Sequence, residues 1–401
     1  MKPLENIRVL DFTRVLAGPT CTRILAELGA QVTKVEPPSG DIGRMAAPQI
    51  QGQSAYYLQL NGGKRNLSID LNWPEAREAA LKLCHKTDVI VENFRPGTMK
   101  TFGLDYESVR QQNPAVVYVS MSGYGQNTPW STRPAFAPTV QAESGATQTQ
   151  MDHFGDDLLQ PVTDWASHAD VYTGLEGAIA VLAGLNKRNA TGTGLHGDVS
   201  MMATMLAVNE RLHAQINELD AADEPLALGA PESPIFKVAD GSLVTIAASP
   251  ISSGVFMRYC GMMGRNDLRT DSRFLTASLR RENLNALLTE IQNWMRSFRS
   301  FEELEHQVSG AGGLAVGKVR TAANLLDTDW AQAADPTYTS LVGDLEIRLP
   351  KGPWLFDGED TGSLSAAVPK GANNREVLYE VGFDDATITA WEDAGILSAD
   401  V

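Results

Sequence analysis

Asp170 is the residue whose surroundings most favour catalysis. It belongs to the stretch His168–Leu175, just ahead of an apolar run over residues 178–185 that predicts a long helix. A carboxylate at the start of a helix is stabilised in its ionised form by the positive end of the helix dipole. An ionised carboxylate beside an apolar wall is a competent nucleophile. The alternative is that Asp170 only caps the helix, the commoner role of Asp at such positions.

Three loops rich in basic and amide groups follow predicted strands or turns: residues 61–65, residues 93–97 with Lys100, and residues 133–136. In open α/β sheets, ligands bind beyond the carboxyl ends of the strands. Backbone amides near glycine, with Lys and Arg, suit phosphate groups. Because the chain has a net charge of −16, three such loops favour an anionic ligand. Lys64 and Arg65 alone could equally form a solvated face.

Other motifs lack the context that their chemistry needs. Gly192–Gly197 matches the GxGxxG pattern, but it follows the predicted long helix instead of a strand, so we interpret it as a turn. Ser122–Gly125 lacks the GxSxG order of a nucleophile elbow. The six histidines show neither HxxxH nor HExxH spacing, which predicts no metal site. The three cysteines form no CxxC pair, so they predict neither a disulfide framework nor a zinc site.

The composition argues against several classes of protein. Nucleic-acid binding needs a basic face, which a net charge of −16 opposes. No window holds the ~18 uninterrupted apolar residues that a membrane span requires. The N-terminus enters an apolar strand with no signal-peptide core. We therefore expect a cytoplasmic enzyme that binds neither nucleic acid nor membrane.

Strands and helices alternate along the first part of the chain. Strands are predicted at residues 7–12, 32–36, 88–92 and 115–121, and helices at 20–28 and 74–86. This alternation predicts an α/β fold with a mostly parallel sheet flanked by helices.

The pattern of predicted strands and helices changes near residue 220. A strand at 243–247 and amphipathic helices near 256–263, 284–295 and 301–308 predict a smaller α+β domain. Gly310–Gly313 marks a crossing back, after which a strand over 341–349 and two short helices beyond Asn374 rejoin the first domain. The expected organisation is a large domain over 1–220, a small domain over 221–315 and a return segment over 316–401.

Seven short motifs together resemble one family, although each alone is weak. They are Val9–Thr13 with Ala17–Pro19, Lys34–Pro38, Gly63–Arg65, Val91–Gly97, Ser122–Gln126, Arg133–Pro134, and Thr191–Gly194 downstream of Asp170. This set resembles the class III coenzyme A transferases, which include formyl-CoA transferase and the carnitine CoA-transferases. The resemblance covers nearly the whole chain.

The resemblance implies a Rossmann-like CoA-binding domain, two subunits interlocked as a homodimer, and Asp170 as the nucleophile. The substrates it implies are an acyl-CoA and a carboxylic acid, with no tightly bound cofactor and no metal. CoA would move between the two acids through a covalent intermediate on Asp170. The implied CoA contacts are Val15, Leu16, Ala17, Leu71, Asn72, Asn93, Phe94, Arg95, Arg133, Ala135 and Phe136, with Lys100 standing in for a basic residue that Thr101 replaces.

Departures from formyl-CoA transferase bear on the acid. Residues 247–253 replace its glycine-rich flap, and Leu16 replaces a polar Gln near the intermediate. Oxalate and formate are therefore poor candidates, and a larger or less polar acid is expected. The sequence does not identify the donor or the acceptor acid.

Two other functions stay open. An α-methylacyl-CoA racemase shares the fold and the Asp but needs an acid and a base on opposite faces of the α-carbon. That branch carries a His after the Arg-Pro motif, where this chain has Ala135-Phe136-Ala137. His168 would share one side of an extended backbone with Asp170. The second alternative is a catalytically idle acyl-CoA-binding protein.

Overall fold

The computed structural model describes residues 2–154, 166–210, 212–217 and 234–400. The chain divides into two compact units, unit 1 (Met1–Glu210 with Asp335–Val401) and unit 2 (Arg211–Ala334). The expected boundary at 220/221 lies outside the described residues. The chain re-enters unit 1 at Asp335, later than the expected residue 316, because residues 316–318 still pair with a strand of unit 2.

Unit 1 is built on a parallel sheet of six strands in the order β5-β2-β1-β6-β7-β8. The strands are β1 (Arg8–Asp11), β2 (Gln31–Glu36), β5 (Arg65–Ser68), β6 (Val89–Glu92), β7 (Val117–Ser122) and β8 (Leu195–Ser200). Numbered by appearance, this is the order 3-2-1-4-5-6 of a doubly wound sheet. The predicted mostly parallel sheet is confirmed. The strand order reverses between β1 and β6, and the loops after these two strands therefore diverge there and leave a crevice.

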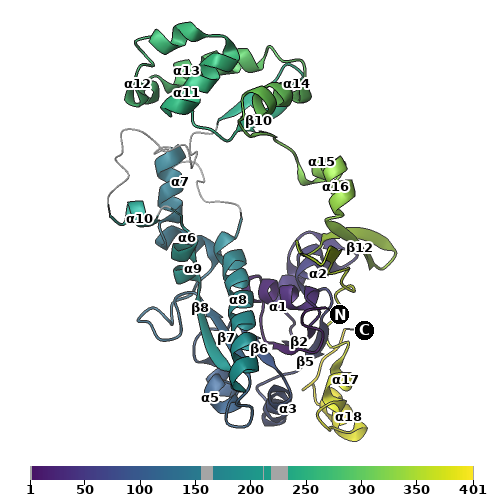
Figure 1. Cartoon of the computed structure of the whole chain (residues 1–401). Coiled ribbons are helices and arrows are strands. Elements are labelled where there is room, and N and C mark those ends of the chain that lie inside the picture. The colour runs from purple at the N-terminus through teal and green to yellow at the C-terminus, as the bar shows by residue number, and fades with distance from the viewer. Residues whose placement is uncertain (1, 155–165, 211, 218–233, 401) are drawn as a thin grey trace. The chain divides into compact units, whose positions relative to one another are not determined.

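Helices cover both faces of the sheet (Figure 1). Successive strand residues point to opposite faces, so Val9 and Val91 pack under α1 (Ala17–Glu27) and α8 (His168–Thr191). Leu10 and Ile90 pack on the other face with α3 (Pro74–His85), α17 (Asn374–Tyr379) and α18 (Asp385–Asp393). The two short C-terminal helices expected in the large unit are confirmed.

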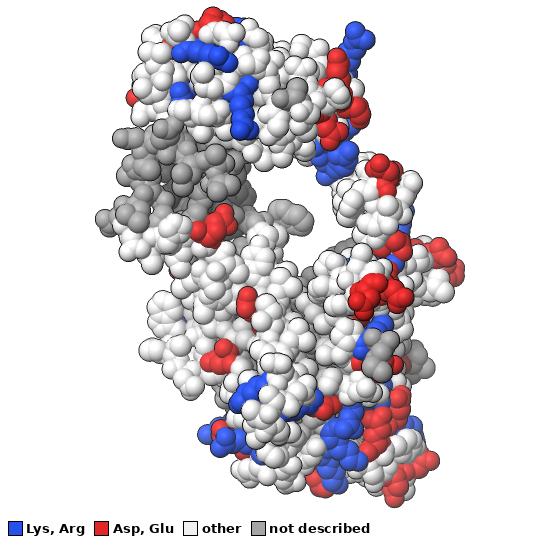
Figure 2. Space-filling view, in the orientation of Figure 1, with Lys and Arg blue, Asp and Glu red and all other residues white. Residues whose placement is uncertain are grey.

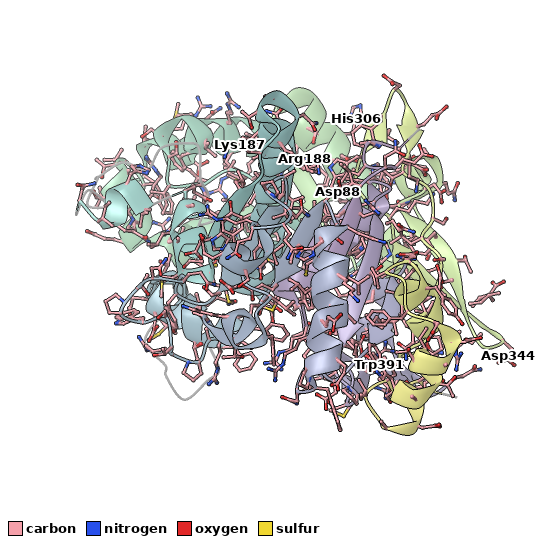
Figure 3. The ribbon with its side chains drawn as sticks, turned by 90° about the horizontal axis from the view of Figure 1, so that it is seen from below. Asp88, Lys187, Arg188, His306, Asp344 and Trp391 are labelled. Atoms are coloured by element: carbon pink, nitrogen blue, oxygen red, sulfur yellow. The ribbon has the colours of Figure 1, made fainter. Side chains whose placement is uncertain are left out.

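Helix α8, 24 residues long, runs antiparallel to the strands. Near its C-terminal end, Arg188 forms an ion pair with Asp88, 2.8 Å away, directly before β6 (Figure 3). Since Asp88 marks the amino edge of the sheet, the start of α8 lies toward the carboxyl edge. Glycines let α8 pack closely: a Cβ on Gly174 would lie 2.6 Å from the carbonyl oxygen of Ala17.

Shorter elements surround this sheet in unit 1. They are η1 (Ile42–Met45), α2 (Ala55–Asn61), α4 (Thr98–Phe102), α5 (Tyr106–Val109), α6 (Ala137–Glu143), α7 (Ala146–Phe154), α9 (Met201–Ala207) and the pairs β3 (Gln49–Ile50)–β4 (Gln53–Ser54), β12 (Thr337–Val342)–β13 (Leu345–Pro350) and β14 (Leu355–Phe356)–β15 (Glu359–Asp360). The prediction of one strand over 341–349 is wrong. Gly343, at φ 61°, turns the chain into the hairpin β12–β13.

Unit 2 holds a small antiparallel sheet in the order β11-β10-β9, packed against helices. Its elements are α10 (Leu212–Gln215), β9 (Ile235–Lys237), β10 (Leu243–Ile246), α11 (Ser253–Met263), η2 (Asn266–Thr270), α12 (Ala277–Glu282), α13 (Leu284–Met295), α14 (Phe301–Glu305), a π-helical turn (His306–Ala311), β11 (Val316–Lys318), α15 (Ala322–Leu325) and α16 (Asp329–Ala334). Val244 of the sheet and Ile291 of α13 share one buried cluster.

The surface carries both signs of charge in close proximity. Over α17 and α18, basic and acidic side chains lie side by side (Figure 2). Arg375 of α17 pairs there with Asp385 and with Glu392 of α18. Among the described residues, no helix is long and apolar enough to cross a membrane.

Candidate active site

The candidate site lies at the crevice where the strand order reverses. Arg14, after β1, and Asn93, after β6, join the two loops by reciprocal hydrogen bonds. The Arg14 amide donates to Asn93 Oδ1, and Asn93 Nδ2 donates to the Arg14 carbonyl, both at 2.9 Å. The Arg14 guanidinium carbon lies 5.6 Å from the centre of the Phe94 ring. The backbone of Phe94 is held in place, because its amide donates a hydrogen bond to Oε2 of buried Glu92 at 2.9 Å.

Asp170 lies inside the first turn of α8, which begins at His168, rather than on a turn ahead of the helix. Its neighbours Ala169 and Thr173 are buried, and Asp170 itself is partly exposed. Because the segment is helical, the side chains of His168 and Asp170, two residues apart, point in widely different directions and do not share one side of the backbone. His168 stacks on Tyr172, with 5.4 Å between ring centres.

Burial raises the pKa of Asp170 to about 6, although the backbone amides of Ala137 and Ala17 act to lower it. The expectation of a cheaply ionised carboxylate is therefore wrong, because loss of water outweighs the favourable dipoles. Ala17 is the first residue of α1 and Ala137 the first residue of α6. The carboxyl group consequently faces two helix starts as well as belonging to a third, an arrangement that suits negative charge once it forms.

Asp170 opens onto a cavity of about 150 Å³. Eight of the residues expected from the sequence line the same cavity: Val15, Ala17, Asn93, Phe94, Arg95, Arg133, Ala135 and Phe136. The remaining lining comes mainly from Arg14, Met121, Gly123 and Thr173. Three loops distant in sequence therefore meet at the carboxylate.

A second cavity, of about 530 Å³, shares Arg14, Phe94 and Arg95 with the first. The expected residues Leu71 and Asn72 line this second cavity. Leu16, which precedes α1, and exposed Lys100 on α4 line neither of the two. The shared residues place the two cavities next to each other, and together they could hold an elongated ligand.

A third cavity, of about 540 Å³, is lined by residues that the sequence did not single out, among them Tyr56, Ile42 and Met45. It shares Arg14, Val15 and Phe136 with the cavity of Asp170. Burial and then the charge of Asp170 raise the pKa of Tyr56 to about 12, so its hydroxyl stays protonated. Ile42 and Met45 are both exposed at this cavity.

The turn that carries Arg133 is held by aromatic rings and an acid. The Arg133 guanidinium forms an ion pair with Glu143 and lies 4.5 Å from the centre of the Trp130 ring. A Cβ on Gly123, after β7, would lie 2.1 Å from the Ala135 side chain, so only glycine allows this approach. Sequence reasoning selected this loop for its charge, whereas the close packing fixes its position.

The loop over residues 61–65 is not part of the site. Lys64 is buried and pairs with Asp11 at 3.1 Å, and Arg65 pairs with Glu376 and Glu380. Both expectations for Lys64, an anion contact or a solvated position, are wrong because its ammonium group belongs to a buried ion pair. The predicted turn from the long helix into a strand is confirmed for Gly192–Gly194: Gly192, at φ 75°, ends α8, whereas Leu195–Gly197 already belong to β8.

Within the part of the chain that the structure describes, no group of three or more His, Cys, Asp or Glu could hold a metal ion. Cys21, Cys84 and Cys260 are free and buried.

Comparisons with known proteins agree with this geometry. The family model of CoA-transferase family III matches residues 4–374. Succinyl-CoA:mesaconate CoA-transferase of Haloarcula hispanica is 34% identical over 314 residues, covering 75% of this chain and 76% of that protein. Human succinyl-CoA:glutarate CoA-transferase is 34% identical over 417 residues, covering 99% of this chain and 90% of that protein.

The crystal structure of Rv3272 from Mycobacterium tuberculosis superposes with a TM-score of 0.79 at 28% identity, covering 94% of this chain and 99% of that one. A CAIB/BAIF family protein from Brucella suis gives 0.77 at 28% identity, covering 95% and 99%. The family match therefore spans both units. The chain belongs to CoA-transferase family III and is a CoA-transferase, with CoA thioesters as its substrates.

Proposed function

We propose that this enzyme moves CoA from an acyl-CoA to a free carboxylic acid through covalent intermediates on Asp170. The observation that carries the proposal is the position of Asp170: it lines the cavity that the loop after β1, the loop after β6 and the turn at residues 133–136 also line. Amides at two helix starts face its carboxyl group. A carboxylate so placed can act as a nucleophile. When the CoA thiolate then attacks the Asp170 carbonyl of the anhydride, the same amides can stabilise the negative charge that develops on its oxygen.

The proposed reaction conserves the energy of the thioester. An Asp170 oxygen attacks the thioester carbonyl, the carbon–sulfur bond breaks, and CoA leaves as a thiolate beside a mixed anhydride. The thiolate attacks the Asp170 carbonyl, which releases the first acid as its carboxylate and leaves a thioester on Asp170. The second acid attacks that thioester and reverses the two steps. Charge balances throughout, and water must be excluded because it would hydrolyse each intermediate.

The adjoining cavities suggest how CoA binds. We infer that the thioester lies near Asp170, with the pantetheine beside Asn93 and Phe94 and the nucleotide end toward Leu71 and Asn72. Exposed Arg95, and Lys100 on α4, are proposed as phosphate contacts. Leu16 remains a proposed neighbour of the acyl group through its position before α1.

We also propose that the enzyme acts as an interlocked homodimer. The support from unit 1 is an apolar stripe on α8, where Val171, Leu175, Ile179 and Leu182 are exposed by 37–56%. Residues three and four apart on a helix share a face, and exposed apolar stripes of this kind are covered in the working protein. Light scattering with size-exclusion chromatography tests the dimer, and a monomer at micromolar concentration contradicts it.

Dicarboxylic acids are the proposed substrate class. Relatives are named as transferases of succinyl-CoA with mesaconate, glutarate or D-citramalate. The test is a screen of carboxylic acids against succinyl-CoA, acetyl-CoA and a long-chain acyl-CoA, with the CoA products identified by mass spectrometry. Transfer only between monocarboxylic acids would contradict this class while leaving the mechanism intact.

The covalent intermediate has a direct test. The enzyme is incubated with an acyl-CoA donor and quenched with hydroxylamine, and the peptide that contains Asp170 is analysed by mass spectrometry. Conversion of Asp170 to its hydroxamate is expected, and Asp170→Asn serves as the matched control. An unmodified Asp170 in enzyme that turns over contradicts the proposal, and so does substantial turnover by Asp170→Asn.

Further measurements separate this function from the racemase and from the idle acyl-CoA-binding protein. The lining of the Asp170 cavity includes no imidazole, and Ala135 and Phe136 form the wall where the racemase branch carries its base. Deuterium incorporation at the α-carbon of a 2-methylacyl-CoA would favour the racemase. Tight acyl-CoA binding without hydroxamate formation or transfer would favour the idle binding protein.

A further inference from the structure

The turn between β1 and α1 contains a strained residue. Val15 has a φ of 68°. This left-handed conformation is rare for any residue other than glycine and a genuine outlier for a β-branched one. Val15 lies two residues before Ala17, whose amide faces Asp170. The strain therefore sits in the segment that presents a donor to the carboxyl group.

A buried ion pair holds both sides of this turn. Lys34 and Asp41 lie 3.0 Å apart, and each side chain is 1% exposed. Lys34 Nζ donates to the carbonyl oxygen of Thr13 at 2.7 Å. The amide of Val15 donates to Asp41 Oδ1 and Oδ2 at 3.1 and 3.3 Å. One charged pair thus bonds to the backbone on either side of Arg14.

Neighbouring groups fix this pair in turn. Asp41 also accepts from the amide of Gly43 at 2.9 Å, which caps η1 and places Ile42 in the adjoining cavities. Burial acts against the charge of Lys34, but the carboxylates of Asp11, Asp41 and Glu36 outweigh it and raise the pKa of the ammonium group. Neither member of the pair can leave without stranding a charge away from water.

We propose that Lys34 and Asp41 are positioning residues for the nucleophile: they hold the strained turn at Val15 so that the amide of Ala17 points at Asp170. The inference rests on the proposed function, since it assigns the pair a task in the step at Asp170. Neither Lys34 nor Asp41 lines the cavity of Asp170, so their effect on the nucleophile passes through the backbone. Asp41 does line the adjoining second cavity, so the readout of the positioning role is kcat and not the KM for acyl-CoA. Without the pair, Val15 relaxes toward negative φ and the amide turns away.

The test is a double-mutant cycle between Asp41→Ala and Val15→Gly. Glycine adopts a φ near 68° without strain, so the turn then needs no clamp. We expect Asp41→Ala to lower kcat about 100-fold with Val15 present, the typical loss for one donor to the reacting oxygen. In the Val15→Gly background the same change is expected to cost less than about 5-fold. A loss of kcat that is equal in both backgrounds overturns the proposal.

The pH profile of kcat supplies a second readout that general damage would not move. The Ala17 amide lowers the pKa of Asp170, so its loss raises the pH at which activity appears. Asp41→Ala is expected to shift the acidic limb of the pH profile to higher pH. Adding Val15→Gly to the same chain is expected to return this limb to its wild-type position. The other charged side chains of this cavity, Arg14, Arg95 and Arg133, are kept in every variant. The neutral hydroxyl of Tyr56 is also kept, although Asp41→Ala removes one of the charges that raise its pKa.

A milder variant covers the case in which Asp41→Ala does not fold. Asp41→Asn keeps an oxygen for the Val15 amide but weakens the pair with Lys34, and it is expected to lower kcat about 10-fold with the same rescue. Unchanged kcat and pH profile in Asp41→Asn overturns the proposal. Hydroxylamine trapping on the wild-type protein separates the two ideas. If Asp170 is trapped but the effects of Asp41→Ala and Val15→Gly on kcat are additive, only the positioning role of Lys34 and Asp41 is refuted. If Asp170 is not trapped, the proposed function is refuted.

Discussion

Replacing Asp170 with Asn should stabilise the fold at alkaline pH while abolishing transfer. Burial raises the pKa of this carboxyl group from 3.8 to about 6, so the folded state holds its proton more tightly than the unfolded chain. For an acid whose pKa is raised on folding, stability falls as pH rises through the window from about 4 to 6 and stays low above it. Ionised Asp170 therefore destabilises the folded wild type at pH 8, and a neutral amide of similar shape does not.

The magnitude follows from the shift. A difference of about two pKa units corresponds to an upper bound of about 3 kcal/mol at ~1.4 kcal/mol per unit. Since Asp170 is partly exposed, solvent screening reduces the expected gain to about 1–2 kcal/mol. For a unit of this size that gain raises Tm by about 2–6 °C. The gain should fall to about half at pH 5 and nearly vanish at pH 4.

The assay is thermal unfolding of wild type and Asp170→Asn between pH 4 and pH 8. Asp329→Asn is the matched control, because Asp329 also lies in the first turn of a helix but is exposed. The control is expected to change Tm by less than about 1 °C, or to lower it slightly through the helix dipole. The reasoning is refuted if Asp170→Asn gives no gain at pH 8, or if its gain is the same at pH 4.

Four further outcomes are expected. In wild type, kcat should fall about tenfold per pH unit below an apparent pKa of about 6, since Asp170 can serve as the proposed nucleophile only when ionised; a flat pH–rate profile from pH 5 to 8 contradicts this. Ala137→Pro should lower kcat about 10–100-fold and raise that apparent pKa, because proline is tolerated at the first helical position and removes the N–H. Since Ala137 is buried, circular dichroism checks that the fold accommodates the added ring. Gly174→Ala should destabilise unit 1 by about 1–3 kcal/mol in urea unfolding, since its Cβ would lie 2.6 Å from the Ala17 carbonyl oxygen. Gly254→Ala, a helical glycine with nothing within 4 Å, should instead stabilise by about 0.5–1 kcal/mol.

Local pattern predicted the elements that carry their own periodicity. Helix α13 lies at the predicted residues 284–295, and the strands around Val9 and Ile90 lie where apolar runs indicated them. Asp170 was selected as the candidate nucleophile because it lies at the start of a helix with a long apolar run. Two errors at element ends have local causes: α8 begins earlier than its apolar run, and Gly343 with Asp344 turns a predicted strand into a hairpin.

What the sequence could not supply is long-range pairing. Lys64 looked like a ligand contact, yet its partner Asp11 is 53 residues away and both side chains are buried. Tyr56 lies on α2 and belongs to no charged loop, yet it lines a cavity together with residues of η1 and of the β1–α1 turn. The partnership of Asp41 with Val15 likewise depends on strand order, which sets which loops are neighbours.

The groups that face the Asp170 carboxyl are main-chain amides. Mutations that change side chains can therefore alter the choice of substrate separately from these donors. Any residue except proline supplies an N–H at positions 17 and 137, so drift at these codons cannot easily erase the donors. Of the side chains that line the cavities, those proposed to contact CoA are constrained, whereas those near the acyl group can change. Point mutations can then change which organic acid the enzyme accepts, while the proposed chemistry at Asp170 is retained.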